Sequence, residues 1–482
     1  MDPEAFEHHL SSPQGRGRIP AGCSPAKVEG GACGDQIEFG LAVRDQRVAE
    51  AGFQAQGCGA ATAAASAAVT LSRGRTVVEA ARIGPREIVE ELGGLSPGKL
   101  HAADVAAEAL ARALGIAVRA QPVLPPLANR TLVAMSGGVD SAVAALLCAL
   151  DGETVAVTLE LWADPENDAE GSCCSASAVA AARALAHSMD LPHFTIDLRD
   201  EFRRGVVEPF VAGYAAGETP NPCVGCNGHV RLDAMLALAD RLGCRRLATG
   251  HYARQAETEH ADGPLLRAAA DPAKDQTYML AALSSESLAR MWFPLGELHK
   301  PRVRELAREA GLPVASKVDS QDLCFLAGTD RAQFLSRHGG LGERPGPIVD
   351  RGGRVLGQHG GQHRYTVGQR RGLGVAGSEP LYVLDKQAAS NHVVVGPRAA
   401  LQTHRVAVRA VRLHRTGERV DRVKLRYRSR PLGARLSGSP MAGRHRLMRI
   451  DLAEPAEGPA PGQLACLMDG ELVIGWGTIA RT

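Results

Sequence analysis

Cysteine is the residue type in this chain with the widest chemical potential, and its spacing is uneven. Cys223 and Cys226 form a Cys-x-x-Cys pair, and Cys324 follows alone much later in the sequence. The total of 11 is odd, which leaves at least one thiol without a disulfide partner, and it is too small for a disulfide scaffold. In a reducing compartment, clustered cysteines point first to metal ligation or to sulfur chemistry.

Other cysteines carry a weaker expectation, because a lone cysteine is usually a small buried hydrophobic residue. Cys148, inside an apolar helical run, and Cys466 fit that description. The adjacent Cys173 and Cys174 could be either buried structural thiols or reactive ones. Their loop is expected to face the same edge of the sheet as the glycine-containing loop at residues 136–141.

A second candidate site is the loop Ser136-Gly137-Gly138-Val139-Asp140-Ser141. Its glycines let the backbone approach an anion closely, and the amides at the start of the next helix would point at that anion with the favourable end of the helix dipole. The serines add hydroxyl donors, and Asp140 is a candidate Mg²⁺ ligand. Because the loop lacks the lysine of the GxxxxGK[ST] phosphate loop, it predicts a nucleotide site of another kind.

The elements that must position this loop are apolar strands alternating with helices. Strands are predicted at 131–135, 154–161, 192–198 and 244–250, and helices at 141–150 and 177–189. This alternation is typical of a parallel, doubly wound α/β sheet, in which ligands bind beyond the carboxyl ends of the strands. The predicted domain spans residues 130–335.

The flanking segments predict further domains. Residues 1–18 are polar without a period and are predicted to be a flexible tail, and 19–118 to be an α+β module with a strand at 37–43, an alanine-rich helix near 57–71 and a helix at 104–114. Three prolines mark a linker at 119–129. After about residue 340, short runs punctuated by glycine and proline predict a central β-rich domain at 336–400 and a C-terminal β-barrel at 401–482.

Composition sets the outer limits of this interpretation. A length of 482 residues predicts about three domains at roughly 150 residues each. The chain is 45% hydrophobic and 22% charged, which excludes wholesale disorder, and its glycine has no collagen period. Neither a signal peptide nor an apolar run of about 18 residues is evident, so we expect a cytoplasmic protein with no membrane partner.

The net charge of +2 conceals a strongly basic stretch. Between residues 401 and 450 the only acids are Glu418 and Asp421, and they stand against 14 basic residues: Arg405, Arg409, Arg412, Arg415, Arg419, Arg422, Lys424, Arg426, Arg428, Arg430, Arg435, Arg444, Arg446 and Arg449. Arginine suits bidentate phosphate contact, so we favour a nucleic-acid surface over a merely solvated face.

Two resemblances sharpen these expectations. The loop SGGVDS resembles the pyrophosphate loop of the PP-loop ATPases, which cleave ATP between the α- and β-phosphates and adenylate a substrate oxygen. Residues 129–482 resemble the tRNA 2-thiouridylase (MnmA) family through these motifs, in family order: ETPNPCVGCNGHVR (218–231), ATGHYAR (248–254), DPAKDQTYML (271–280), FPLGELHKPRVRELA (293–307), SQDLCFL (320–326) and GQHRYTVGQRRGLGV (361–375).

This resemblance implies an ATP-dependent tRNA-uridine 2-sulfurtransferase that adenylates C2 of the wobble uridine (position 34) and replaces its oxygen with sulfur. It implies that Cys324 carries a persulfide and that Cys226 releases the sulfide or resolves the reaction as a disulfide. The implied ATP site is Ala134, Met135, Ser136, Gly137, Gly138, Val139, Asp140, Ser141, Leu159 and Gly250, with Mg²⁺. The implied tRNA contacts are Asn221, Pro222, Cys223, Lys274, Asp275, Gln276, Arg426 and Tyr427; single-stranded bases are read by stacking, which suits the tyrosine.

One departure from the family leaves the sulfur chemistry open. Many members have an aspartate where this chain has Cys223. Cys223, Cys226 and Cys324 together are also a candidate ligand set for a [4Fe–4S] cluster with one open iron. A zinc site is the less favoured alternative, since no second Cys-x-x-Cys or histidine pair accompanies the first.

The N-terminal module resembles the IscU/NifU iron–sulfur scaffold family through GACGDQI (31–37), GFQAQGCGAATAAAS (52–66) and GKLHAADVAAEAL (98–110). Cys33, Asp35, Cys58 and His101 match its ligand motifs, but Ala102 replaces the third cysteine. The resemblance implies a degenerate metal site in a module that relays sulfur or a cluster from a cysteine desulfurase or another sulfur donor; the alternative is a docking domain without metal.

Two other functions compete with this interpretation. One keeps adenylation and sulfur but thiolates another tRNA base or a small molecule. The other, of a different class, is a non-catalytic iron–sulfur or sulfur carrier, which predicts no tRNA-stimulated release of pyrophosphate.

Overall fold

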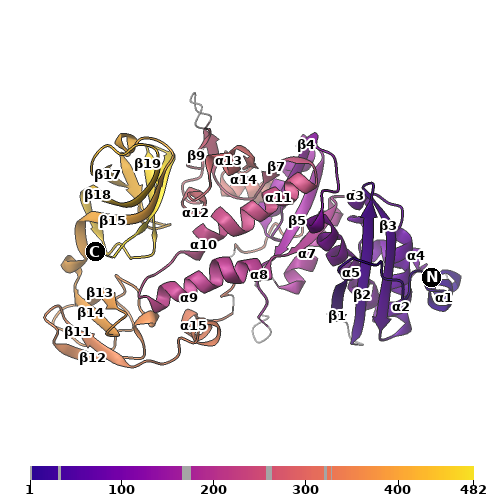
Figure 1. Ribbon diagram of the computed structural model, residues 1–482, viewed down its shortest axis with the longest axis horizontal. Coiled ribbons are helices and arrows are strands. Elements are labelled where there is room, and N and C mark those ends of the chain that lie inside the picture. Colours follow the sequence, from indigo (N-terminus) through magenta and orange to yellow (C-terminus); the bar gives the residue numbers. More distant parts are fainter. Residues whose placement is uncertain are drawn as a thin grey trace.

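The computed structural model describes residues 3–30, 34–164, 175–256, 263–319, 323–326 and 328–481. Its domains follow one another along the long axis of the molecule (Figure 1). The N-terminal module lies at one end, the central domain in the middle, and two β-rich domains at the other end. None of the described helices has the length and apolar character needed to cross a bilayer.

The N-terminal module is an antiparallel sheet covered by helices. Its strands pair in the order β1-β2-β3, with Phe39 opposite Phe53 in the core. The alanine-rich run forms a helix, as predicted, and its small side chains let it pack closely. The elements are α1 (Pro3–Ser11), β1 (Ala26–Gly30), β2 (Asp35–Arg44), β3 (Arg47–Gln56), α2 (Gly59–Ser72), α3 (Val77–Ala80), α4 (Pro85–Glu91), η1 (Pro97–Lys99) and α5 (Leu100–Ala120).

The prediction of a flexible tail at residues 1–18 is wrong for the described part. Residues 3–11 form helix α1, which packs against α2. His9 is buried, and its Nδ1 lies 2.8 Å from the hydroxyl of Ser66. The sequence showed no apolar period there because the helix is anchored through a buried polar pair as well as through Phe6 and Leu10.

Helix α5 belongs to two domains at once. It packs on β1 and β2 of the module and on strand β6 (His193–Asp197) of the central sheet. One hydrophobic core consequently runs from Ile37 in the module to Met235 in the central domain. The predicted linker is also part of this packing, since the amides of Val123 and Leu124 donate to the carbonyl of Arg241.

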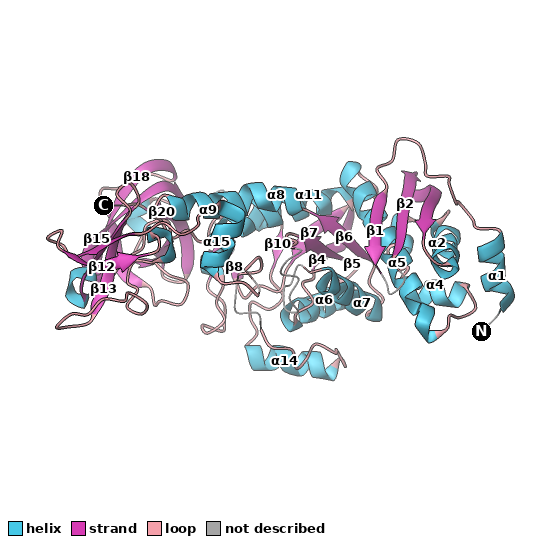
Figure 2. Ribbon diagram, turned by 90° about the horizontal axis from the view of Figure 1, so that it is seen from below, coloured by secondary structure: helices cyan, strands magenta, loops and turns pink. Residues whose placement is uncertain are grey.

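The central domain is the predicted doubly wound sheet, with all strands parallel in the order β10-β7-β4-β5-β6. Helices α6 and α7 cover one face and α8 and α11 the other (Figure 2). Its strands are β4 (Leu127–Ala134), β5 (Thr154–Glu160), β6, β7 (Cys244–Ala248) and β10 (Met291–Trp292), and a hairpin adds β8 (Arg254–Ala256) and β9 (Leu265–Arg267). Its helices are α6 (Val139–Asp151), α7 (Ala176–Ser188), α8 (Arg199–Phe202), α9 (Glu208–Ala215), α10 (Pro222–Gly225), α11 (Leu232–Arg241), α12 (Thr277–Leu280), α13 (Ser285–Ala289), α14 (Lys300–Glu309) and α15 (Arg331–Gly339).

Two long helices connect the sheet to the β-rich end (Figure 1). One consists of α8, the π-helical turn η2 (Arg203–Val207) and α9, and the other of α10, the π-helical turn η3 (Cys226–Arg231) and α11. The two π-helical turns contact each other. Such turns are rare and frequently mark functional sites.

The β-rich end contains two units, as predicted. The first is a sheet in the order β12-β11-β14-β13, and the second is a barrel in the order β15-β18-β17-β16-β19-β20 that closes through pairing of β20 with β15. Strand β9 of the central domain adds to β20 and joins the barrel to the centre. The elements are β11 (Gly346–Val349), β12 (Val355–His359), η4 (Gln362–Arg364), β13 (Leu381–Gln387), β14 (His392–Pro397), η5 (Arg398–Leu401), β15 (Gln402–Leu413), η6 (Gly417–Arg419), β16 (Arg422–Lys424), β17 (Leu432–Leu436), β18 (Gly443–Glu457), β19 (Leu464–Asp469) and β20 (Leu472–Ile479).

Candidate nucleotide and thiol site

The SGGVDS loop lies where the order of the central sheet reverses. The chain leaves β4 toward β5 and β6, and then returns to place β7 on the other side of β4. Ligands of open α/β sheets bind in the crevice at such a point. The loop follows β4, Leu159 lies near the end of β5, and Gly250 follows β7, so the fold brings the predicted ATP-site residues to one edge.

The loop is held by its own hydrogen bonds. The amide of Ser136 donates to the hydroxyl of Ser141 (3.1 Å), which donates to the carbonyl of Gly138 (3.0 Å). Gly137 adopts a φ of +69°, which favours glycine. A Cβ on Gly250 would lie 2.7 Å from the amide nitrogen of Ser141, so this glycine lets β7 approach the start of α6.

A network of charges links the loop to the segment that leads to Cys324. The ammonium of Lys300 lies 2.7 Å from Asp140 and 2.8 Å from Asp319, and Lys274 lies 2.7 Å from Asp319. Burial raises the pKa of Asp319, but hydrogen bonds from Lys274 and Lys300 outweigh it and hold the pKa at about 2. The predicted Mg²⁺ ligand Asp140 is thus engaged by Lys300 and by the hydroxyl of Tyr252 (2.9 Å).

Sequence reasoning missed three residues of this network. Lys300 and Asp319 were not predicted, and neither was Lys317, whose ammonium donates to the carbonyl of Gly137 (2.9 Å). A signal was present, because Lys300 lies inside the motif FPLGELHKPRVRELA and the other two directly precede SQDLCFL.

The candidate reactive thiols lie on or beside the two long helices. Cys226 begins the π-helical turn η3 and is 7% exposed, whereas Cys223, in α10, is half-buried. Asn221 caps α10 by accepting from the amide of Cys223 (3.2 Å). Cys324 is half-buried, and the ring of the neighbouring Phe325 packs edge-to-face against Phe202 and Phe210 of the α8–η2–α9 helix, with ring centroids 5.8 and 5.2 Å apart.

A buried histidine connects the nucleotide edge to the Cys226 helix. Nε2 of His251, next to Gly250, lies 3.3 Å from the guanidinium of Arg231 at the end of η3, and Nδ1 lies 2.8 Å from the hydroxyl of Thr249. Burial lowers the pKa of His251 to about 3, and Arg231 adds to this effect. The ring is therefore neutral at pH 7, and its Nε2 can accept from Arg231.

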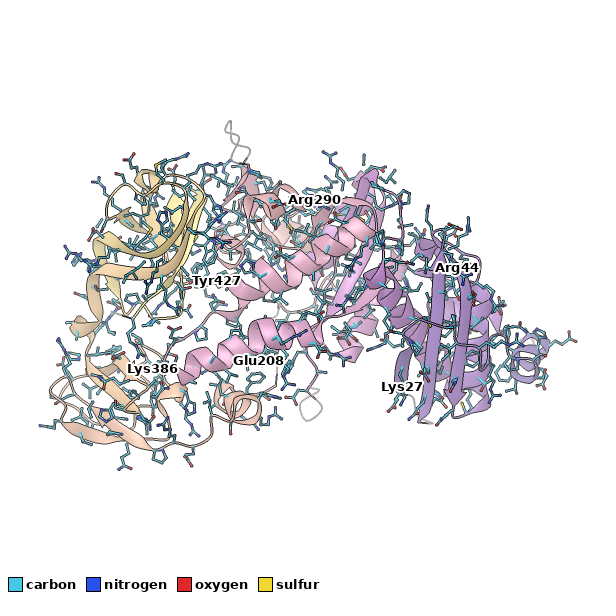
Figure 3. All side chains as sticks on the ribbon, viewed as in Figure 1. Lys27, Arg44, Glu208, Arg290, Lys386 and Tyr427 are labelled. Atoms are coloured by element: carbon cyan, nitrogen blue, oxygen red, sulfur yellow. The ribbon has the colours of Figure 1, made fainter. Side chains whose placement is uncertain are left out.

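The predicted tRNA contacts converge from separate elements. The amide of Asn221 lies 3.7 Å from the sulfur of Met279, Gln276 exchanges hydrogen bonds with the backbone of Tyr252, and Lys424 of the barrel lies 3.4 Å from Asp275. Tyr427 packs beside Tyr278, and Figure 3 shows it on the part of the barrel that faces α10. Burial raises the pKa of Tyr427, and the charges of Asp275 and Cys223 act in the same direction. Arg426 donates to the carbonyl of Gly458 (2.7 Å).

The basic stretch at 401–450 is less positive in the folded protein than its sequence indicates. Acids from elsewhere pair with it: Glu218 with Arg409, Asp275 with Lys424, Asp451 with Arg405, Glu454 with Arg430 and Asp469 with Arg419. The excess of 14 basic over two acidic residues between 401 and 450 therefore overstates the charge available to a nucleic acid.

The N-terminal module gathers three metal-ligand side chains. Atoms of Asp35, Cys58 and His101 lie within 4.8 Å of one another, the spacing that a single ion needs. The Nε2 of His101 is buried 3.2 Å from Asp35 and makes no well-directed hydrogen bond with any described residue. This donor set fits one metal ion, with Ala102 buried where the family has a further thiol. Cys33 lies outside the described residues.

Cys148 and Cys466 are buried, as the sequence predicts. Burial raises the pKa of the thiols of Cys148 and Cys466 to about 12, so neither forms a thiolate at pH 7. Cys244 is buried in the same way. Cys173 and Cys174 lie outside the described residues.

The fold and the loop define a nucleotide-binding α/β domain followed by two β-rich domains and preceded by a scaffold-like module. Comparison with known families assigns each part. Residues 129–328 match the family described as the tRNA methyl transferase HUP domain, and residues 3–118 the NifU-like N terminal domain. Residues 332–397 match the tRNA methyl transferase PRC-barrel domain, and residues 404–479 the aminomethyltransferase beta-barrel domain.

Similar curated proteins give the family. The bifunctional protein NifU/MnmA of Rubrobacter xylanophilus is 44% identical over 494 residues, which covers 99% of this chain and 98% of that protein. The tRNA-specific 2-thiouridylases MnmA of Zymomonas mobilis (41% over 365 residues) and Methylorubrum extorquens (43% over 371) each cover 74% of this chain and 95% of their own length. The chain belongs to the tRNA-specific 2-thiouridylase (MnmA) family, in the form that carries a NifU-like domain at its N-terminus. The resemblances of residues 129–482 to the MnmA family and of the N-terminal module to the NifU family are confirmed.

Proposed function

We propose that this chain is an ATP-dependent tRNA-uridine 2-sulfurtransferase that converts the wobble uridine to 2-thiouridine. The observation that carries the proposal is that one fold joins an SGGVDS loop at the switch point of the sheet to the Cys226 helix through His251 and Arg231. Activation of an oxygen and delivery of sulfur both need to occur at one base, and this arrangement serves both.

In the first step, the C2 oxygen of the uridine attacks the α-phosphate of ATP and pyrophosphate leaves. The amides at the start of α6 and the cations Lys300 and Lys317 are suited to hold the phosphates. Mg²⁺ would neutralise phosphate charge, with Asp140 as its candidate ligand. Asn221, Cys223, Gln276 and Tyr427 would orient the base, while Lys274 and Arg426 contact the tRNA backbone.

In the second step, the outer sulfur of a persulfide on Cys324 attacks C2 and AMP leaves. The thiolate of Cys226 then attacks the inner sulfur of Cys324, which releases 2-thiouridine and forms a Cys226–Cys324 disulfide. A dithiol or two equivalents of a monothiol must reduce this disulfide, and a sulfur donor must then restore the persulfide on Cys324, before the next cycle. Phe202 and Phe210, which pack against Phe325 beside Cys324, lie on the helix whose η2 turn contacts η3. The segments that carry Cys324 and Cys226 are therefore linked by packing, which favours reaction between the two thiols.

The decisive assay measures tRNA-stimulated pyrophosphate release together with 2-thiouridine by nucleoside mass spectrometry. Wild type should give both products, whereas Cys324→Ala and Cys226→Ala should release pyrophosphate without forming 2-thiouridine. Thiolation of a different nucleoside would change the substrate assignment, and absence of tRNA-stimulated pyrophosphate would favour a non-catalytic carrier.

Cys223, Cys226 and Cys324 are also the candidate ligands of a [4Fe–4S] cluster. Anaerobic purification separates the two routes, because a cluster brings iron, acid-labile sulfide and absorbance near 400 nm, approximately where thiolate-to-iron charge transfer occurs. Loss of these signals in Cys223→Ala would favour the cluster, and full thiolation by an iron-free preparation would favour the persulfide.

For the N-terminal module we propose a sulfur or metal relay built on Asp35, Cys58 and His101, fed by a cysteine desulfurase or another sulfur donor. The buried Nε2 of His101 and the spacing of the three ligands support it. Cys58→Ala should slow thiolation when a desulfurase supplies sulfur but not when free sulfide does, because sulfide can attack Cys324 in the Cys226–Cys324 disulfide, which restores the persulfide on Cys324 and releases the Cys226 thiolate. Equal slowing with both sources would contradict the relay.

A further inference from the structure

The segment between α9 and α10 lies where the central domain meets both β-rich domains. This segment, residues 216–221, leads directly into the Cys223–Cys226 turn. Lys386, on β13, lies at the end of α9 in Figure 3. The inference below rests on the proposed function, because it concerns the thiols that the proposal makes reactive.

Lys386 is a buried lysine whose ammonium group contacts the 216–221 segment and the end of α9. The residue is 1% exposed. Its ammonium donates to the carbonyl of Glu218 (2.9 Å) and to the hydroxyl of Thr219 (3.4 Å), and it lies 5.3 Å from the centre of the Tyr214 ring, within cation–π range. A buried charge is costly unless it is fully partnered, so this placement requires a compensating role or a tight local fit.

Barrel residues hold the same segment from the other side. The side chain of Gln463 donates to the carbonyl of Thr219 (2.6 Å), the amide of Thr219 donates to the carbonyl of Pro461 (2.7 Å), and Arg409 pairs with Glu218 (2.7 Å). Two glycines at positive φ permit this approach. A Cβ on Gly217 would lie 2.9 Å from the carbonyl of Lys386, and one on Gly462 would lie 2.9 Å from the Cβ of Glu218.

The chain between this clamp and the thiols has little freedom. Pro220 packs on Gly213, where a Cβ would come within 2.9 Å of the proline ring. Pro222 then begins α10, and Asn221 caps that helix. Because two of the four residues from Pro220 to Cys223 are prolines with a restricted φ, a shift at Thr219 would be carried to Cys223 and onward to Cys226.

We propose that Lys386 is a positioning residue for the Cys223–Cys226 turn, through which the β-rich domains set where the reactive thiols lie. It touches neither tRNA nor ATP in this role. It acts by holding Glu218 and Thr219 against the β-rich end of the molecule.

The environment of the ammonium makes the clamp sensitive to pH. Burial lowers the pKa of Lys386 to about 7, and the guanidinium groups of Arg331 and Arg481 add to this effect. Charged and titratable groups face Lys386 from every neighbouring element: Arg331, Arg481, Asp385, Glu218, Tyr214 and His363. Loss of the proton leaves two N–H donors in place of three and removes the attraction to the Tyr214 ring.

The test compares Lys386→Met with Gln387→Met, a matched change at the next, exposed position of the same strand. Lys386→Met should lower kcat for thiolation about 10-fold or more with KM for tRNA changed far less, because misplacing reacting groups by about 1 Å costs on the order of 100-fold. The ratio of wild-type to variant kcat should fall as pH rises through about 7. Gln387→Met should behave as wild type.

Cysteine labelling supplies a readout that does not depend on thiolation. Alkylation of Cys226 by iodoacetamide, resolved by mass spectrometry, should be several-fold faster in Lys386→Met, whereas alkylation of Cys466 should not change. Thr219→Val removes only the hydroxyl and covers the case in which Lys386→Met does not fold. The effects of Lys386→Met and Thr219→Val should be non-additive, as expected for groups in contact.

The outcomes separate the two proposals. Wild-type kcat and Cys226 labelling in both folded variants would overturn the positioning role. Altered labelling in an enzyme whose wild type thiolates no tRNA would overturn the proposed function and leave the positioning role standing.

Discussion

At the residue scale, the candidate nucleotide site is defined by a few charges that compensate one another. Lys300 is nearly buried and serves two carboxylates, Asp140 and Asp319. Removal of one partner from a buried ionic group leaves the others uncompensated, which costs about 3–5 kcal/mol when the group is fully buried. Lys300 therefore compensates the charge of Asp140, the one acid of the SGGVDS loop, where phosphates must bind.

Lys300→Met should reduce tRNA-stimulated pyrophosphate release about 10- to 100-fold, since Asp140 would lose its cationic partner and repel ATP, and one phosphate-neutralising cation would be lost. Arg302→Met, on the exposed side of the same helix, is the control and should retain the rate. Melting curves of both variants distinguish loss of catalysis from loss of fold. Equal rates in the two variants would remove Lys300 from the site.

At the element scale, α5 decides how the N-terminal module is joined to the rest. It buries one side on β2 and another on β6, and Arg112 of α5 pairs with Glu160 at the end of β5. Arg183 of α7 pairs with Glu108 of α5. A helix of the module thus takes the place of a covering helix at the edge of the central sheet.

Gly115 makes this contact close enough, and Gly115→Ala tests it. A Cβ at this position would lie 2.0 Å from the carbonyl oxygen of Thr195, and backbone must shift to accept it. We expect the variant to lose about 1–3 kcal/mol in the free energy of unfolding, the usual cost of overpacking. Denaturant titration measures it. Gly98→Ala has open space around it and should change little.

At the scale of the whole molecule, the shared core makes the module inseparable from the catalytic half. A chain that begins at residue 121 lacks α5 and exposes the side of β6 that α5 covers. We expect this truncated chain to aggregate or to melt at a lower temperature than the full chain, as measured by light scattering and calorimetry. A soluble truncated chain with unchanged melting would contradict the shared core. Cys58→Ala is therefore the sharper probe of the relay.

The whole molecule should also lose stability in mild acid. Burial lowers the pKa of His251 to about 3 and that of His414 to about 4, both below the 6.5 that is ordinary for a histidine. Between pH 6.5 and the lowered pKa values, these histidines bind protons in the unfolded chain but not in the folded one. The stability that depends on them is therefore fully present above about pH 6.5 and is lost as pH falls toward 4. His414→Gln should flatten the dependence of unfolding free energy on pH, whereas the exposed His404→Gln should not.

Much of the fold was predictable because its signals are local. Apolar strand runs, the glycine loop and the alanine-rich helix depend on the preferences of neighbouring residues, and they appear close to their predicted bounds. Helix α1 was missed because its anchor, His9 on Ser66, joins residues far apart in sequence. The candidate site was predictable only where a motif marked it, as at Cys226 and Asp140.

What the sequence determined by itself was the set of elements, the family and the residues able to do chemistry, since these are encoded in short stretches. Only the tertiary structure decided which charges meet. It paired Arg409 and Lys424 of the basic stretch with distant acids, placed Lys300 between two carboxylates, and buried Lys386 against the segment that carries the thiols. Ion pairing and burial depend on distances between elements, which no local pattern contains.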